Sequence, residues 1–486
     1  MAATVSTVRA LAAVCVAVLG TILFASEPEA AGMRGDVRMT ASYLDYRVLV
    51  RESIPESEVE GDGVVRRLPD GTTVYCIPDG DCYAYRAAGT ESSVPMTQEV
   101  RASAWARGGI AARAHLRTRL GTDSFWPRSS ERFLVVTAYS ELDRARYRVR
   151  VGRQEMWSGL GTYRFDGAAA SLETWDAVHI QAFVGRSLGR AATTPGIGDL
   201  LQNADDLAPD EESVLWGFEA GFAPWRGLSG SAIYQREERF DEAGLYSERA
   251  ALDARWSARR TAVDLSLDWD FALAEMTEAR LRLAQGITRD VSFRLEGRRY
   301  QPSFDLWTIW NVFSPVAYRE ERAAVSWALW RGLRVEIEEA YRDCDDTSTE
   351  SEAFPIETDA WRFLGSAQWN SARWSGTAAY RLHQGFGAFK SAVDASVRRR
   401  IGDRAHIGAF GSGTQQFDEF RSGEQVIWGG GVEGRAAAGR VGVEARGGID
   451  RHGFYDRPGY EPVTQLRGTL AITLAFGQDP GEAQWR

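Results

Sequence analysis

From about residue 96 to the C-terminus, the chain alternates between apolar and polar residues in blocks of about ten. In residues 261–271, one set of alternate positions is apolar and the other is polar: Val263, Leu265, Leu267, Trp269 and Phe271 against Asp264, Ser266, Asp268 and Asp270. A period of two places the two sets on opposite faces of a β-strand, and a helix would not keep this phase. The pattern predicts an all-β fold.

The breaks between these blocks are of two kinds that alternate along the chain. Some are very short, such as Arg226-Gly227 and Arg331-Gly332, and others are long and polar, such as residues 188–212 and 343–358. Short turns at one end and long loops at the other are typical of a closed antiparallel transmembrane β-barrel, with the short turns periplasmic and the long loops extracellular. Trp225 and Trp330 stand at block ends, where membrane barrels carry aromatic girdles.

The blocks predict 22 strands, within a range of 18–22. The first runs near Met39–Val50, a long loop covers Arg51–Pro95, and the second strand runs near Met96–Ala106. The remaining strands are expected to start near residues 110, 132, 146, 164, 177, 213, 228, 245, 261, 278, 291, 318, 333, 360, 375, 389, 405, 424, 441 and 463. A soluble β-sandwich or propeller is the alternative, but its strands average about five or six residues, whereas about ten are needed to cross a bilayer.

The chain ends indicate export to a membrane. Arg9 precedes the uncharged run Ala10–Ser26, which is typical of a secretory signal peptide, so we expect residues 1–31 to be a signal peptide and residues 32–486 to form the barrel. A membrane anchor is the alternative. The apolar last strand, Arg467–Phe476, resembles the C-terminal recognition strand of bacterial outer-membrane proteins, followed here by a short tail, residues 477–486. That resemblance implies the barrel-assembly machinery as a partner.

The long first loop contains two of the four cysteines. Cys76 and Cys82 flank a Pro-Asp-Gly turn, a spacing that a hairpin disulfide can close in an oxidising compartment; metal binding is the alternative. We expect a small hairpin of Val64–Arg67 and Thr72–Cys76, within a loop that folds over or into one mouth of the barrel. Cys344 is left over as a free thiol.

Composition and motifs exclude several functions. The chain has 57 basic and 67 acidic residues, a net charge of −10, and no basic cluster of the kind that binds nucleic acid. The five histidines are scattered, and no hydrolase, phosphate-binding or zinc motif occurs, so we expect no metal, no cofactor and no enzymatic activity. A Ser-His-Asp site assembled from neighbouring strands is an alternative that spacing alone does not reveal.

The polar face of the strands is expected to line the lumen. Charges of both signs in the interior fit a water-filled channel, and the fork of arginine suits carboxylate or phosphate groups. The alternative is that these charges only pair with one another. The predicted pore-lining residues are Arg113, Arg117, Arg119, Arg148, Arg150, Arg153, Arg249, Asp253, Arg255, Asp264, Asp268, Arg280, Arg282, Arg294, Glu296, Arg298, Arg398 and Arg400.

The segment at the end of the fifth predicted strand is a candidate constriction. Gly152-Arg153-Gln154 and Phe165-Asp166-Gly167 flank a glycine-rich stretch, and a bulge at Gly152 would return Arg153 to the lumen. This passage of about 16 residues resembles one in Gram-negative outer-membrane porins, including the alginate-export-like group, in which the intervening loop folds into the pore. The charged run usual between the two motifs is absent here. The resemblance implies a passive pore, with Trp157, Tyr163, Arg164 and Asp166 in the constriction.

Together these observations predict a porin-like channel in the outer membrane for passive diffusion of small hydrophilic solutes, with anionic solutes suited to its arginines. Its partners would be outer-membrane lipid and lipopolysaccharide. The alternative is a structural or surface-interaction barrel with a plugged lumen and no transport.

Overall fold

A computed structural model describes residues 32–61, 65–69, 73–77, 81–106, 108–121, 133–175, 177–191, 212–240, 244–301, 317–330, 332–345, 359–385, 389–417, 425–454 and 462–477. The expected signal peptide and all but the first residue of the expected tail lie outside these residues. Within them, no helix is both long and apolar enough to cross a membrane. The elements are the 3-10 helix η1 (Glu56–Glu58) and the strands β1 (Gly32–Ile54), β2 (Val65–Arg67), β3 (Thr73–Cys76), β4 (Cys82–Ser93), β5 (Pro95–Ala106), β6 (Ile110–Gly121), β7 (Phe133–Asp143), β8 (Tyr147–Ser158), β9 (Gly161–Trp175), β10 (Val178–Ala191), β11 (Ser213–Trp225), β12 (Leu228–Arg239), β13 (Leu245–Ala258), β14 (Thr261–Asp270), β15 (Glu275–Gly286), β16 (Val291–Tyr300), β17 (Tyr318–Trp330), β18 (Leu333–Cys344), β19 (Asp359–Asn370), β20 (Trp374–Gly385), β21 (Phe389–Ile401), β22 (Ala405–Phe417), β23 (Gln425–Ala438), β24 (Val441–Phe454) and β25 (Val463–Gly477).

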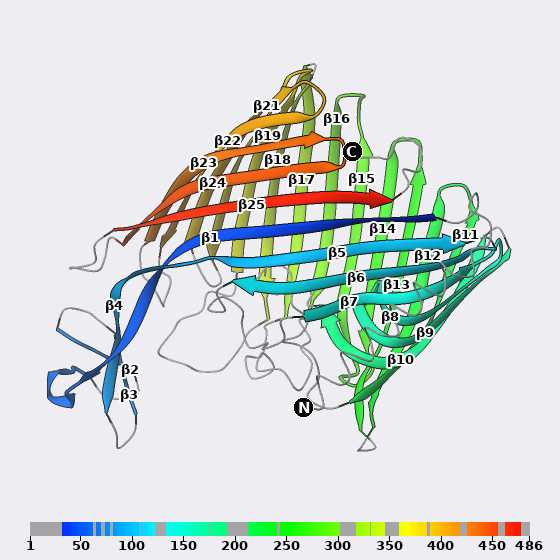
Figure 1. Cartoon of the computed structure of the whole chain (residues 1–486), viewed down its shortest axis with the longest axis horizontal. Helices are drawn as coiled ribbons and strands as arrows, with labels where there is room; N and C mark the ends of the chain where they lie inside the picture. The colour runs from blue at the N-terminus through cyan, green and yellow to red at the C-terminus, as the bar shows by residue number, and fades with distance from the viewer. Residues whose placement is uncertain are drawn as a thin grey trace.

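β1 and β5–β25 form a closed antiparallel barrel of 22 strands (Figure 1). Each strand pairs with its neighbours in chain order, and the ring closes where β25 pairs with β1 from Arg34↔Gly477 to Leu44↔Arg467. At this seam the Phe476 ring lies over Gly35, where a side chain would collide with it. The predicted strand number is confirmed, and from the second strand onward each predicted start falls within three residues of the observed one.

The two faces of the barrel wall differ in chemistry. One carries large exposed apolar side chains, such as Leu281, Val325 and Ile337, and the other carries the charged residues. On the charged face, ion pairs reach over an intervening strand, as from Arg294 on β16 to Glu338 on β18. Strands lie about 4.8 Å apart, so such contacts are favoured on the concave side, where side chains converge. The charged face is therefore the inner one.

Tryptophans on the apolar outer face mark two levels. Trp225, Trp330 and Trp374 lie at strand ends beside the short turns, whereas Trp269 and Trp428 lie toward the long loops; all five are exposed. β19 carries both levels, with Trp361 and Trp369 eight residues apart and therefore about 26 Å apart along the strand. An outer-membrane barrel has an apolar band about 25 Å tall between two aromatic girdles. The outer face has the layout of a membrane-spanning wall.

The segment between the first two barrel strands corrects a prediction. β1 begins at Gly32 rather than near residue 39, and after Leu44 it leaves the barrel and continues to Ile54, paired with β4. With the β2–β3 hairpin these strands form an arm that projects away from the barrel (Figure 1), so residues 51–95 are not a loop folded over a mouth. The backbone hydrogen bonds between β1 and β4 hold the two strands together as an extended ribbon beyond the barrel wall.

The arm has a small hydrophobic core of its own and a covalent link. A disulfide of 2.01 Å joins Cys76 to Cys82, and both cysteines are buried. Cys344, at the end of β18, is a buried free thiol. The core of the arm consists of Ile54, Leu68, Val74, Cys76, Cys82 and Ala84.

Candidate functional site in the barrel lumen

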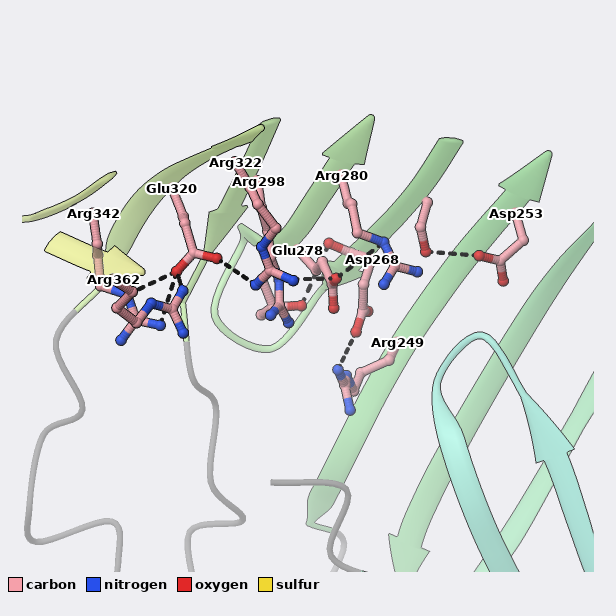
Figure 2. A network of polar contacts seen from close by, with 12 residues as sticks. Arg249, Asp253, Asp268, Glu278, Arg280, Arg298, Glu320, Arg322, Arg342 and Arg362 are labelled. Carbon is pink, nitrogen blue, oxygen red and sulfur yellow. Dashed lines mark hydrogen bonds and ion pairs between the residues drawn. The ribbon is translucent and has the colours of Figure 1, made fainter. Parts of the chain in front are cut away.

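A row of charged side chains crosses the inner wall from β13 to β19 (Figure 2). The antiparallel register creates the row, because partners on neighbouring strands point to the same face. Arg280 is paired with Arg298 in register, Arg298 with Glu320, and Glu320 with Arg342. Six of the ten residues labelled in Figure 2 are arginines and four are carboxylates, so the row combines charges of both signs.

Glu320 on β17 is the centre of this row. Its side chain is only 2% exposed, and three guanidinium groups from three successive strands surround it. Arg322 on β17 lies at 2.8 Å, Arg342 on β18 lies at 3.0 Å, and Arg362 on β19 contacts the same carboxylate. Arg322 also lies 3.4 Å from Glu338 on β18, so three guanidiniums meet two carboxylates, which leaves N–H donors of these guanidiniums over for another acceptor.

The remainder of the row is built from smaller pairs. Arg298 Nε lies 3.2 Å from Glu278, and Arg249 pairs with Asp268. The hydroxyl of Ser266 donates to Asp253 at 2.6 Å. Hydrogen bonds to a charged partner are stronger than neutral ones, so these pairs fix the side-chain positions along the wall.

A second cluster lies on β6, β7 and β8. Glu141 on β7 is 4% exposed and contacts Arg150 at 2.7 Å, Arg113 at 3.5 Å and Arg148 at 3.9 Å. Around the ring of 22 strands, β7 and β17 are ten positions apart, so the Glu141 and Glu320 clusters lie on nearly opposite walls. Glu141 is near the short-turn end of its strand and Glu320 is near the long-loop end of its own.

Other predicted lumen residues occupy the same face. Arg117 contacts Glu99 at 2.8 Å on the wall of β5 and β6, and Arg398 pairs with Glu433 across β22. Arg255 lies 3.5 Å from Asp264, and Arg119 is buried. The register places these further predicted residues on the inner face with them: Arg280, Arg282, Arg294, Glu296 and Arg400.

The ends of β8 and β9 fold inward and narrow the lumen. β8 pairs with β7 only as far as Arg153, and β10 pairs with β11 only as far as Arg186. Beyond those points residues 154–165, here called the flap, lie on the inner wall. There Met156, Leu160, Tyr163 and Phe165 form a buried cluster with these residues of β10–β13: Phe183, Leu215, Ile233 and Ala251.

The tip of the flap reaches β13. An added Cβ at Gly159 would lie 2.3 Å from the carboxylate of Asp253. Because the Met156 face packs against the wall, the opposite face, with Trp157 75% exposed, is turned away from that wall. Trp157 and Tyr163, two of the predicted constriction residues, therefore occupy opposite faces of the flap.

The structure corrects the expected role of Gly152. The register between β7 and β8 is continuous through Gly152, so there is no bulge there, although Gly152 has a φ of +128°. Arg153 therefore stays on the opposite face of β8 from Arg150. Arg153 instead makes two hydrogen bonds of 2.8 Å to Asp166 and donates a third to the Val135 carbonyl at 3.1 Å. It thereby gives a hydrogen-bond donor to a carbonyl on the edge of β7, beyond the point where β8 stops pairing with that strand. Arg164 is buried.

Sequence reasoning missed the centre of the site. Arg319, Glu320, Glu321 and Arg322 are consecutive charged residues, so the alternation that marks inward positions is lost there. Counting parity back from the apolar Val325 would have placed Glu320 and Arg322 inward. Among the described residues, no cluster of three or more His, Cys, Asp or Glu side chains could hold a metal ion.

No family model matches the sequence, and no curated protein matches it. Solved structures similar to this chain include Pseudomonas aeruginosa OccK3 (OpdO), with TM-score 0.40 and 9% identity over 92% of this chain and 96% of that one. A BenF-like porin from Pseudomonas fluorescens has TM-score 0.43 and 8% identity over 92% and 99%. The Pseudomonas aeruginosa outer membrane protein opdK has TM-score 0.42 and 9% identity over 93% and 99%. At these values the fold assignment depends on the strand pairing described above.

Proposed function

We propose that the protein is an outer-membrane channel through which small hydrophilic solutes, anions in particular, diffuse passively. The observation that carries this proposal is the row of arginines and carboxylates from β13 to β19 on the inner wall of a closed barrel. An interior lined with charges of both signs holds water, and the apolar outer face with its two tryptophan levels suits a bilayer.

The preference for anions follows from the arrangement of the charges. At Glu320 three guanidiniums surround one carboxylate, and Glu338 adds a second at 3.4 Å from Arg322; at Glu141 three guanidiniums face two carboxylates, because Arg148 also lies 2.9 Å from Asp143. Each cluster therefore has one guanidinium more than it has carboxylates. Conduction requires binding that is weak and divided over several sites, and two clusters on opposite walls and at opposite ends of the barrel supply such sites.

The flap sets the width of the pathway. A barrel of 22 strands encloses a wide lumen, and residues 154–165 fill part of it from the β10–β13 side. The inward course of this segment agrees with the resemblance of Gly152-Arg153-Gln154 and Phe165-Asp166-Gly167 to the porin passage, and the alginate-export-like group stays a proposal on those residues alone.

Placement in the outer membrane assigns the remaining partners. Lipid would contact the apolar outer face, lipopolysaccharide would surround the long-loop end, and the assembly machinery would recognise the strand that ends at Phe476. Residues 1–31 would direct export. None of these steps needs a cofactor or a catalytic residue.

Planar-bilayer recording of the purified chain tests the proposal. Stepwise conductance with a reversal potential on the anion-selective side is expected in a KCl gradient; no conductance above baseline at any voltage would reject a pore. Arg322→Gln is expected to reduce the anion preference. The matched control is Arg319→Gln, which removes the same charge from the outer face of the same strand.

Two deletions separate a narrowed pore from a plugged scaffold. Replacing residues 155–164 with a short glycine-serine turn is expected to raise the single-channel conductance, because the flap occupies the lumen. Shortening the arm by removing residues 56–80 is expected to leave conductance unchanged, because the arm projects away from the barrel.

A surface-interaction role is the second candidate, and the arm favours it. The arm exposes Tyr75 and Ile77 beside its disulfide, and Arg51 stacks on Tyr83 at 3.9 Å, all outside the barrel. If both deletions leave the bilayer silent while loss of the arm abolishes attachment to a surface, this second role replaces transport.

A further inference from the structure

The short-turn end of the barrel carries a ring of arginines. Ten short turns join the strands at this end, and nine of them contain arginine. Their eleven arginines stand against three aspartates, Asp176, Asp290 and Asp403, a surplus of eight positive charges at one rim. The eleven, here called the rim arginines, are Arg107, Arg144, Arg146, Arg226, Arg259, Arg260, Arg289, Arg331, Arg373, Arg404 and Arg440.

The rim arginines that the structure describes differ from those of the lumen in having no carboxylate partners among the described residues. The structure describes nine of them, all but Arg107 and Arg331, and each of the nine is exposed. None of the nine forms an ion pair with an acidic side chain of the described residues. Two make main-chain contacts only: Arg260 donates to the Ile287 carbonyl at 3.2 Å and Arg440 donates to the Gly477 carbonyl at 3.0 Å.

A hollow in the outer face lies just above this rim. It has a volume of about 720 Å³, within the range of about 300–1,000 Å³ usual for small-molecule sites. Val397, Ile407 and Val432 form its sides, and Gly434 and Gly447 are among its lining residues. The register places all five on the apolar face. Elsewhere on this face, as on β14–β18, leucines, valines and isoleucines project from the wall.

One charged side chain lines the hollow from the outer face. Arg399 lies beside the short turn between β21 and β22, with its guanidinium 5.4 Å from the centre of the Trp374 ring. Like the rim arginines, it forms no ion pair with a described acidic residue. It therefore presents a positive charge at the level of the tryptophans, where lipid headgroups meet acyl chains.

We propose that the short-turn rim binds anionic phospholipids of the periplasmic leaflet, and that the hollow seats one of them with its phosphate on Arg399 and an acyl chain against Gly434 and Gly447. The proposal rests on the membrane placement given above but not on conduction. Arginine binds phosphate through its fork of N–H donors, and each basic residue at a membrane surface attracts anionic lipid.

The distribution of the charges favours lipid over a protein partner. A leaflet surrounds a barrel on all sides, whereas a protein would contact one arc of the rim. Arginine occurs in nine turns of ten around the whole ring, which matches a partner that is itself a ring.

Native mass spectrometry of the full chain, released from mixed phosphatidylglycerol and phosphatidylcholine micelles, tests the rim. Retention of phosphatidylglycerol over phosphatidylcholine is expected, falling by about fivefold for each arginine removed in the series Arg226→Gln, Arg373→Gln and Arg404→Gln. The control is Arg299→Gln with Arg319→Gln, two exposed arginines at the other end of the barrel, which should leave retention unchanged. Equal loss in both sets, or in neither, overturns the rim assignment.

Filling the hollow tests the seat. An added Cβ at Gly447 meets no atom within 4 Å and one at Gly434 meets none closer than 3.7 Å, so Gly434→Leu with Gly447→Leu should fold normally. This variant and Arg399→Gln should each lose the most tightly held lipid, while Gly297→Leu, at an equally open site on β16, should keep it. Retention of that lipid by the variant with both leucines overturns the lipid site in the hollow. The site is also overturned if the unaltered protein forms a dimer that these two leucines abolish. Conductance is measured separately, so a silent pore that still holds lipid rejects the channel alone.

Discussion

Arginines in the lumen and arginines at the short-turn rim are the same side chain in two opposite situations. Inside, Arg322, Arg342 and Arg362 converge on one buried carboxylate. At the rim, Arg146 and Arg260 are exposed and have no acidic partner among the described residues. Charge pairing, rather than residue type, therefore decides what an arginine does. Lumen guanidiniums are held in fixed positions that a passing anion meets, and the described rim guanidiniums, which have no acidic partner among the described residues, can meet one outside the chain.

The largest expected effect comes from removing the carboxylate at the centre of the lumen row. Glu320→Gln removes the carboxylate that three guanidiniums share, and among the described residues only Arg322 keeps another acidic partner, Glu338. Breaking a fully buried pair costs about 3–5 kcal/mol. Because the three arginines are 21–30% exposed, we expect the unfolding free energy to fall by roughly 2–3 kcal/mol. The urea midpoint of unfolding in lipid vesicles measures this loss.

The control for this change is Glu321→Gln, at the next position on the outer face of β17, where no shift in the midpoint is expected. The same Glu320→Gln channel should become more anion-selective, because the surplus of positive charge grows. A midpoint equal to that of the unaltered protein would mean that the three arginines do not depend on Glu320.

A smaller effect is expected from a direct comparison of the two arginine populations across one turn. Arg150 lies 2.7 Å from Glu141 inside the lumen, and Arg146 lies in the turn that precedes β8. Arg150→Gln should lower the unfolding free energy by about 1.5–3 kcal/mol, which is the contribution of a hydrogen bond to a charged group. Arg146→Gln should cost less than about 0.5 kcal/mol in a zwitterionic bilayer. Equal costs would erase the distinction between paired and unpaired arginines.

Salt should weaken the selectivity without closing the pore. Raising ionic strength from 0.1 M to 1 M shortens the Debye length from about 10 Å to about 3 Å, so the field of the lumen row is screened over the width of the pathway. The anion-to-cation permeability ratio from reversal potentials should fall toward one while the conductance rises. A ratio independent of salt would place the selectivity in a steric filter instead.

The smallest effect is expected at the rim itself. Arg259→Gln with Arg260→Gln should change the unfolding free energy by no more than about 0.5 kcal/mol in zwitterionic lipid, because neither side chain has an acidic partner in the described residues to lose. The reversal potential should also be unchanged. A shift in selectivity would bring these arginines into the conduction pathway.

The barrel itself was predictable from the sequence because each strand repeats one simple constraint. Lipid on one face and water on the other force an alternation of period two, as in residues 261–271, and the turns interrupt it. The arm was not predictable in the same way. Residues 45–54 and 82–93 pair with each other outside the bilayer, where no lipid imposes the alternation that would have marked them as strands.

Two parts of the site depended on three-dimensional information. Arg153 was expected in the lumen by a bulge, yet β8 keeps its register and turns inward as a whole, a course set by the contact of Met156 and Phe165 with the wall. Glu320 was hidden among consecutive charged residues. The rim arginines, in contrast, were readable in the sequence, since each follows the end of a predicted strand, but the lack of acidic partners for the nine described ones was not.

The charged face of the wall is expected to line a water-filled pathway, and the apolar face is expected to lie outside it. Cysteine placed at Ser326 on the inner face of β17, and separately at Val325 on the outer face, tests it when a negatively charged thiol reagent is added during bilayer recording. The reagent is expected to lower the current and the anion preference of Ser326→Cys and to leave Val325→Cys and the unaltered chain, with its buried Cys344, unchanged. A response from Val325→Cys alone would contradict it.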